Sequence, residues 1–237
     1  MIHVVDLVGK FQYALDNKWG YIWGTAGELW TAAKQKELEK TTDPDRAMSR
    51  KYGSKWVGHM VADCSGLFSW AFKELGGYMY HGSNTMWNKY CVNKGELVKG
   101  VREDGLELKP GTAVFCYNKE KDNRGHVGLY VGNGIVIEAA GTKAGVTTSK
   151  ITDKKWVEWG ELKGVEYGGE PQPVPEGYAI VTGTNLALRQ GPSTSCAVIA
   201  RAPTGSRVKI TEPPSEWEYV MYNGKQGYMM KKYLQEG

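Results

Sequence analysis

Apolar residues at helical spacing dominate the first half of the chain. The pattern predicts an amphipathic helix within residues 1–20 and further helices over residues 27–40, 44–53 and 64–75. The last of these has one continuous apolar face, which a helix buries against the rest of its domain. The residues of this face are Leu67, Phe68, Ala71, Phe72 and Leu75.

The spacing changes from helical to extended after Pro110-Gly111. Strands are predicted over residues 112–117, 126–131 and 135–140. Short loops separate these strands, so we expect them to pair as a small antiparallel sheet. Helices first and such a sheet second indicate an α+β domain.

A segment rich in proline and glycine divides the chain into two parts. Residues 169–177 cannot form a helix or a central strand, and we interpret them as a linker after a first domain over residues 1–168. Beyond the linker, short alternating runs such as 179–181 and 207–210 are separated by turn residues. This pattern predicts a small all-β barrel over residues 178–237.

The bulk properties exclude several classes of protein. The net charge of +4 over 237 residues would suit an anionic polymer such as a cell wall, but no basic run is interleaved with aromatic residues as in nucleic-acid-binding proteins. No stretch approaches 18 apolar residues, so we expect no membrane span. Asp6, Lys10 and Asp16 interrupt the apolar core that an export signal needs, so such a signal was removed or export uses another route.

The four cysteines do not suggest a disulfide framework or a metal site. Cys64, Cys91, Cys116 and Cys196 include no pair at CxxC spacing, and the four histidines show no ligand spacing. We expect no metal and no organic cofactor.

Cys64 lies at the start of the predicted 64–75 helix, in Asp63-Cys64-Ser65-Gly66. The positive end of a helix dipole lowers the pKa of a thiol and so favours the nucleophilic thiolate. A small buried residue with no chemical role is the alternative interpretation. The choice between them depends on whether a base lies nearby.

His126 is the histidine with the clearest strand setting, next to Gly125 and close to Gly128. These glycines would leave room for a substrate beside the imidazole, which makes His126 the first candidate for the general base. His59, five residues before Cys64, and His81, near a predicted loop, remain alternatives.

Glu138 stands in an otherwise apolar run and is the candidate to orient the imidazole. A solvent-facing position on an edge strand is the alternative. A two-residue turn at Asn133-Gly134 would point His126 and Glu138 to opposite faces of the sheet. A three-residue loop, 132–134, would place them on one face, so the triad hypothesis requires that loop.

Four sequence blocks, in this order, resemble the NlpC-type cell-wall peptidases. They are Tyr21-Ile22-Trp23-Gly24, Asp63-Cys64-Ser65-Gly66-Leu67, Leu108-Lys109-Pro110-Gly111-Thr112-Ala113-Val114-Phe115 and Gly125-His126-Val127-Gly128-Leu129-Tyr130-Val131-Gly132-Asn133-Gly134. The resemblance covers residues 10–140. It implies a papain-like α+β fold with a cysteine nucleophile at Cys64 and a histidine base at His126.

The resemblance also implies a substrate and further site residues. Family members typically cleave peptidoglycan stem peptides, often between D-glutamate and the diamino acid. Tyr21 resembles the tyrosine that lines the site, and Asp63 and Ser65 resemble the residues that bind the free amino end of the stem peptide. The chain departs from the family pattern at Glu138, where a neutral polar residue or histidine is common, and by an insert over residues 25–61.

Residues 178–237 resemble a bacterial SH3-like domain through Asn185-Leu186-Ala187-Leu188-Arg189-Gln190-Gly191-Pro192-Ser193 and Gly227-Tyr228-Met229. Such domains hold enzymes on the cell wall or shape their clefts. The expected protein is a monomeric, secreted or wall-associated cysteine endopeptidase that contacts peptidoglycan or muropeptides. An amidase or transferase on the same scaffold, a wall-binding protein, and a phage lysin with the same chemistry are the alternatives.

Overall fold

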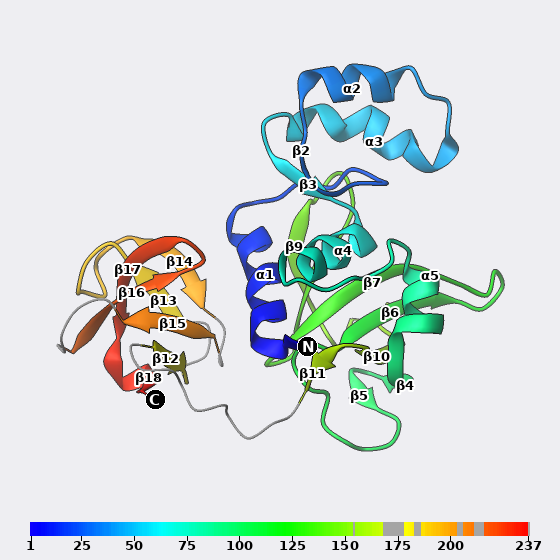
Figure 1. Cartoon of the computed structure of the whole chain (residues 1–237). Coiled ribbons are helices and arrows are strands. Elements are labelled where there is room, and N and C mark those ends of the chain that lie inside the picture. The colour runs from blue at the N-terminus through cyan, green and yellow to red at the C-terminus, as the bar shows by residue number, and fades with distance from the viewer. Residues whose placement is uncertain (154, 168–177, 183–185, 203–205, 211–215, 237) are drawn as a thin grey trace.

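The computed structural model shows two units (Figure 1). The larger contains α1 to α5, one seven-stranded sheet and two two-stranded sheets, and the smaller is built mostly from strands. The described residues are 1–153, 155–167, 178–182, 186–202, 206–210 and 216–236. The predicted linker, residues 169–177, lies outside them, so the proposed domain boundaries stay a prediction.

The helices lie mostly where the apolar spacing predicts them. Their bounds are α1 Val4–Asp16, α2 Ala32–Glu39, α3 Ala47–Tyr52, α4 Cys64–Glu74 and α5 Ser83–Thr85, with short helical turns η1 Pro44–Arg46, η2 Gly53–Trp56, η3 Met86–Tyr90 and η4 Lys231–Tyr233. The prediction of a helix from residue 27 is wrong, because residues 26–29 form a strand that pairs with residues 60–62. Within the described residues, no helix is long and apolar enough to cross a membrane.

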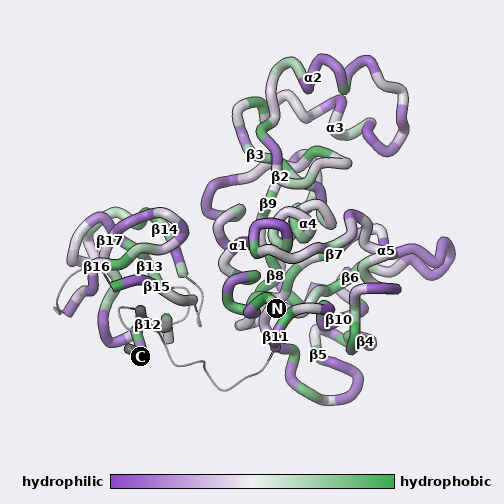
Figure 2. Tube along the Cα trace, in the orientation of Figure 1, coloured by the Kyte–Doolittle hydropathy of each residue, from purple (hydrophilic) through white to green (hydrophobic). Residues whose placement is uncertain are grey.

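Helices α1 and α4 pack together through their apolar faces. The Phe11 and Phe68 rings meet edge to face at 4.6 Å, and both side chains are fully buried in the main core. Figure 2 shows hydrophobic residues along α4 and the central strands, whereas α2 and α3 are mostly hydrophilic. The predicted apolar face of α4 is therefore the face that positions it on the sheet.

The main sheet has seven strands in the order β5-β4-β10-β6-β7-β8-β9, and its pairings are antiparallel. The bounds are β4 Cys91–Val98, β5 Val101–Arg102, β6 Ala113–Asn118, β7 Asn123–Gly132, β8 Ile135–Ala139, β9 Val146–Lys150 and β10 Glu158–Leu162. Strands β6, β7 and β8 confirm the three predicted ones. The outer strands and β10 carry weaker patterns and were not predicted.

A two-residue turn followed by a β-bulge sets the register of the β7–β8 hairpin, and the sequence did not predict this combination. Gly132 pairs with Ile135 across a two-residue turn, and both turn residues, Asn133 and Gly134, have positive φ. A bulge then shifts the pairing, because Tyr130 and not Val131 lies opposite Val136. The predicted three-residue loop is wrong, but one bulged residue has the same effect on which side chains share a face.

The insert predicted over residues 25–61 forms a compact lobe beside the sheet. It contains α2, α3 and a two-stranded sheet, β2 Ala26–Leu29 with β3 Met60–Ala62. Its small core consists of Trp30, Leu38, Trp56 and Val61, together with Ile22 from just before the insert. The lobe is therefore a folded unit with its own buried residues.

The smaller unit is an all-β structure, as predicted. Its strands are β12 Tyr178–Val181, β13 Leu186–Arg189, β14 Val198–Ala202, β15 Arg207–Ile210, β16 Trp217–Tyr222, β17 Lys225–Met230 and β18 Leu234–Glu236, in the sheet order β14-β13-β17-β16-β15-β12-β18. A two-residue strand pair, β1 Ile2–His3 with β11 Val165–Glu166, joins the ends of the larger unit.

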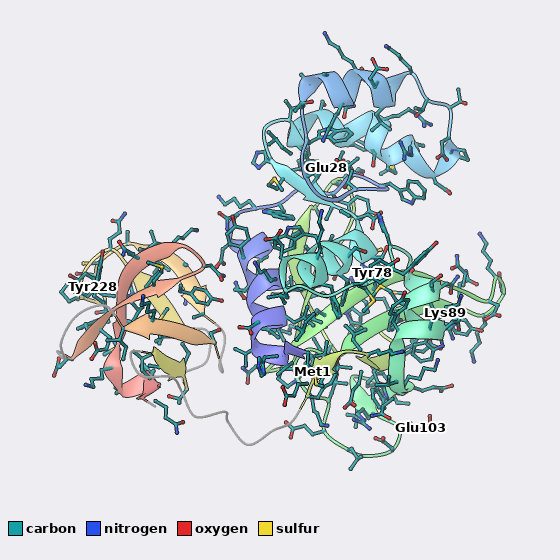
Figure 3. All side chains as sticks on the ribbon, viewed as in Figure 1. Met1, Glu28, Tyr78, Lys89, Glu103 and Tyr228 are labelled. Atoms are coloured by element: carbon teal, nitrogen blue, oxygen red, sulfur yellow. The ribbon has the colours of Figure 1, made fainter. Side chains whose placement is uncertain are left out.

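The smaller unit contacts α1, and its tyrosines divide between two positions. Asn223 Nδ2 donates to the Gly9 carbonyl at 3.3 Å, beside the buried Tyr222. Tyr219 and Tyr228 pair at 4.8 Å between ring centroids, and Figure 3 places Tyr228 on the side away from α1. Tyr222 therefore lies at the contact with α1, whereas Tyr228 lies on the other side of the smaller unit.

Gly128 on β7 is a position where a side chain cannot fit. A Cβ there would lie 2.6 Å from Val136 and 2.9 Å from Trp156, whereas a Cβ on Gly125 of the same strand would meet nothing within 4 Å. We expect Gly128→Ala to lower the free energy of unfolding by about 1–3 kcal/mol through overpacking. Gly125→Ala is the matched control and should stay within about 0.5 kcal/mol of the parent. Equal losses in urea unfolding would contradict this account.

Candidate active site

Cys64 is the first residue of α4, as its sequence setting predicts. Asp63 caps the helix, since its carboxylate accepts a hydrogen bond of 2.8 Å from the Gly66 backbone N–H. Cys64 is 8% exposed, and the backbone N–H of Val127 on β7 is near enough to its sulfur to favour the thiolate. Because Val127 follows His126, the helix start and the histidine strand meet at this sulfur.

The start of α4 acts on the thiol pKa in the predicted direction, but burial outweighs it. Burial, with a further contribution from the Asp63 carboxylate, raises the pKa of Cys64 to about 12, although backbone N–H groups at the helix start act in the opposite direction. At neutral pH the free protein therefore holds a thiol at Cys64. A neighbouring base must take its proton before the sulfur can attack.

His126 lies on β7 with its ring held on two sides. Its Nε2 is 2.6 Å from Glu138 Oε2, and its ring stacks on Trp156 at 5.6 Å between centroids. With Nε2 engaged by the carboxylate, Nδ1 is the nitrogen left for a nucleophile. Trp156 also fills the space beside Gly128, so this glycine makes room for the indole and not for a substrate, contrary to the sequence interpretation.

Glu138 is 1% exposed and points to the same face of the sheet as His126. Its second oxygen, Oε1, accepts a hydrogen bond from Lys155 Nζ. Burial alone would raise the pKa of Glu138, but hydrogen bonds from His126, Lys155 and Ser149 outweigh it and lower the pKa to about 2. The carboxylate therefore stays ionised at neutral pH, as a residue that orients an imidazole must.

Sequence reasoning missed Lys155 and Trp156. The Trp156 indole Nε1 donates to Ser149 Oγ at 3.2 Å, and Ser149 in turn bonds Glu138. Both residues precede β10 in a stretch without regular structure, and neither belongs to a motif block. The buried charge of Glu138 was the signal that could have directed attention to a nearby cation.

The three predicted substrate residues surround the nucleophile. Ser65 Oγ donates to Asp63 Oδ1 at 3.2 Å, and the Gly24 N–H donates to Asp63 Oδ2 at 2.8 Å. Burial, followed by the charges of Cys64 and Asp63, raises the pKa of the Tyr21 phenol. Tyr21 therefore lies close to both groups, despite the insert between them in the sequence.

The two alternative bases have other positions. His81 Nε2 lies 2.7 Å from Asp63 Oδ2, which raises the pKa of His81, so this ring serves the helix cap. His59 is exposed and packs edge to face against Trp56 at 5.7 Å within the insert. Among the three candidates, His126 is the one bound to Glu138.

Two family models match the chain. The model described as NlpC/P60 family matches residues 49–161, and the model described as bacterial SH3 domain matches residues 184–235. The chain therefore carries an NlpC/P60 domain, followed by a bacterial SH3 domain. Cys64, His126, Glu138 and Lys155 lie inside the first match, and Tyr21 lies before it.

Curated proteins and solved structures give more distant matches. The chain is 30% identical over 95 residues to a gamma-DL-glutamyl hydrolase of Bacillus subtilis, covering 40% of this chain and 20% of that protein. It is 26% identical over 144 residues to the murein DD-endopeptidase MepH of Escherichia coli, covering 55% and 48%. The peptidoglycan hydrolase RipB of Mycobacterium tuberculosis is 21% identical with a TM-score of 0.41, covering 69% and 65%. The chain thus spans less than half the length of these two curated relatives.

The buried Glu138 charge predicts a specific loss of stability in acid. Because its pKa falls from 4.5 to about 2 on folding, its contribution is present above pH 4.5 and is lost as the pH falls towards 2. We expect the parent to lose about 1–3 kcal/mol more than Glu138→Gln over this window in urea titrations. Glu120→Gln, which removes an exposed carboxylate, should follow the parent. A parent and a Glu138→Gln variant with equal pH slopes would show that the pKa of Glu138 is not lowered.

Proposed function

We propose that this protein is a cysteine peptidase that hydrolyses peptidoglycan stem peptides. The observation that carries the proposal is the His126–Glu138 hydrogen bond of 2.6 Å on the strand whose Val127 N–H meets the Cys64 sulfur. A nucleophile, a base and a residue that orients the base are the groups that acyl transfer through a thiol requires. The NlpC/P60 family match and the hydrolase names of the curated relatives agree with this chemistry.

The reaction begins with proton transfer, because Cys64 is held as a thiol. His126 Nδ1 takes the proton as the sulfur attacks the scissile carbonyl, and the backbone N–H groups at the start of α4 stabilise the oxyanion. The imidazolium then gives its proton to the leaving amine, and a thioester to Cys64 remains. Water, deprotonated by His126, attacks the thioester and releases the acid and the thiol.

Glu138 and Lys155 support the imidazole through both steps. The Glu138 carboxylate accepts a hydrogen bond from the Nε2–H group, which leaves Nδ1 to take the thiol proton, and it stabilises the imidazolium. Lys155 bonds the other oxygen, so the buried carboxylate has partners on both sides. These two partners explain how the charged Glu138 can orient the imidazole at a position where the family commonly has an uncharged residue.

We propose the D-glutamyl–diamino acid bond as the target, with a free L-alanine amine near Asp63. Asp63 is 6% exposed, and its carboxylate accepts hydrogen bonds from Ser65 and His81, so an ammonium group would find an anion at the start of α4. The curated relatives are named for different bonds, a gamma-DL-glutamyl bond and a DD bond. The protein would act on the cell wall as a monomer, outside the cell, with the SH3 domain as a wall anchor or a support for α1.

Cys64→Ala should abolish hydrolysis of a defined stem peptide, because no other group in the site forms the thioester. Product is measured by mass spectrometry after digestion of L-Ala-γ-D-Glu-L-Lys-D-Ala. Cys196→Ala removes a free thiol of the SH3 domain and should cleave like the parent. If Cys64→Ala cleaves as fast as the parent, the peptidase mechanism is wrong.

Acetylation of the L-alanine amine should lower kcat/KM roughly 10- to 100-fold, because a charged hydrogen bond to Asp63 is lost. The comparison uses the free and the acetylated form of the same peptide with the parent enzyme. Equal rates for the two peptides would remove Asp63 and Ser65 from substrate binding and leave the Cys64 chemistry intact.

A further inference from the structure

His81 lies next to the start of α4, although it belongs to the segment that joins α4 to α5 (Figure 1). Its Nε2 is 2.7 Å from Asp63 Oδ2, and Asp63 directly precedes Cys64. The helix cap itself is the hydrogen bond from the Gly66 N–H to the other oxygen, Oδ1. The contact with His81 is therefore a second feature of this carboxylate.

The Asp63 carboxylate already has four donors. Its Oδ1 accepts from the Gly66 N–H at 2.8 Å and from the Ser65 hydroxyl at 3.2 Å. Its Oδ2 accepts from the Gly24 N–H at 2.8 Å and has His81 as its second partner. A carboxylate offers about four lone-pair sites. An ammonium group that hydrogen-bonds to Asp63 must therefore replace one of these donors.

His81 is the donor that can be replaced most easily. Two of the others are backbone N–H groups, and Ser65 is 5% exposed, whereas the His81 side chain is 33% exposed. His81 also lies in residues 77–82, which form neither helix nor strand, and such segments move more readily than helices. An incoming ammonium group would therefore displace the His81 ring.

The charge of His81 decides how strongly the ring resists this displacement. The hydrogen bond to Asp63 raises the pKa of His81 above its ordinary value of 6.5, so the ring is charged at pH 6.5 and below and loses its charge as the pH rises further. A hydrogen bond between an imidazolium and a carboxylate is about twice as strong as one between neutral groups. A neutral His81 therefore gives up its place more readily than a charged one.

The other titratable groups beside Asp63 keep one charge state near neutral pH. Tyr21 and Cys64 lie next to it, and burial raises the pKa of both, so both are neutral. His81 is thus the group in contact with Asp63 whose charge changes in this range.

Cations on the neighbouring elements are engaged with other carboxylates. Arg46 of the insert comes close to Gly24, but it pairs with Asp43 at 3.7 Å. Arg124 on β7 donates two hydrogen bonds to Glu158, at 2.7 and 2.8 Å. The competition at Asp63 is therefore between His81 and a cation that enters with the substrate.

We propose that His81 determines when the site selects a peptide with a free amino end. As an imidazolium it occupies the place on Asp63 Oδ2 that the ammonium group of the substrate takes, and as a neutral ring it yields this place. The inference rests on the proposed function, since it adds a competitor to the amine site of the same enzyme. The enzyme then distinguishes free from blocked peptide ends in neutral medium and does so poorly in mildly acidic medium.

The free and the N-acetylated form of L-Ala-γ-D-Glu-L-Lys-D-Ala test this role, with kcat/KM measured for both from pH 5.5 to pH 7.5. This range stays below the pKa of the peptide's α-amino group, about 7.7–8.0. The ratio of the two values removes the contribution of His126, which acts on both peptides alike. We expect the ratio in the parent to rise roughly 3- to 10-fold over this range, because a charged hydrogen bond is harder to replace than a neutral one.

His81→Gln keeps a neutral donor at every pH. Its ratio should be as high at pH 5.5 as at pH 7.5. His59→Gln is the matched control, because His59 is an exposed histidine of the insert that packs against Trp56. The ratio in this control should rise as it does in the parent.

The outcomes separate the role of His81 from the proposed function. If the parent's ratio stays constant above one, or if it still rises in His81→Gln, His81 does not compete for Asp63 and the peptidase stands. A ratio of one at every pH would remove the amine site, and the role of His81 with it, and leave the Cys64 chemistry intact. If the parent cleaves neither peptide, the proposed function fails and the inference fails with it.

Discussion

The buried charge of Glu138 is the interaction on which the site depends. A carboxylate that is 1% exposed is stable inside a protein only when donors surround it. Here the donors come from separate segments, His126 on β7 and Lys155 just before β10. The register of the β7–β8 hairpin brings the first donor to the carboxylate, and the path of the chain into β10 brings the second. Removing either partner would leave a costly charge in the sheet.

Two opposing effects act on the nucleophile, and their balance sets the mechanism. The start of α4 presents N–H groups that favour a thiolate, while burial and the Asp63 carboxylate favour the thiol. Burial and the Asp63 carboxylate have the larger effect, since the pKa of Cys64 rises to about 12. In the proposed mechanism, His126 therefore acts as a base before the first bond forms, and not as the partner of a preformed ion pair.

The insert changes the shape of the site without changing its chemistry. Trp56 packs in the core of the insert and also donates to the Thr142 carbonyl, so one residue stabilises the lobe and its junction with the sheet. Tyr21 stays near Cys64 despite the long segment between them. Hydrogen bonds made by Gly20 at one end of the insert and by Asp63 at the other hold the two ends together. The lobe therefore supplies one wall of a pocket whose other walls are Tyr21, Trp23 and the loop over residues 140–144.

Local sequence patterns determined much of this protein: α1, α4, the strands β6 to β8, the β-rich second unit, and Cys64 with His126 as candidates. These features follow from periodicity and from motif blocks, which act over a few residues. The tertiary structure alone decided whether His126 and Glu138 share a face, because one bulged residue at Val131 reverses that outcome. It alone placed Lys155 against the carboxylate and raised the thiol pKa, since burial and long-range pairing depend on how distant segments pack.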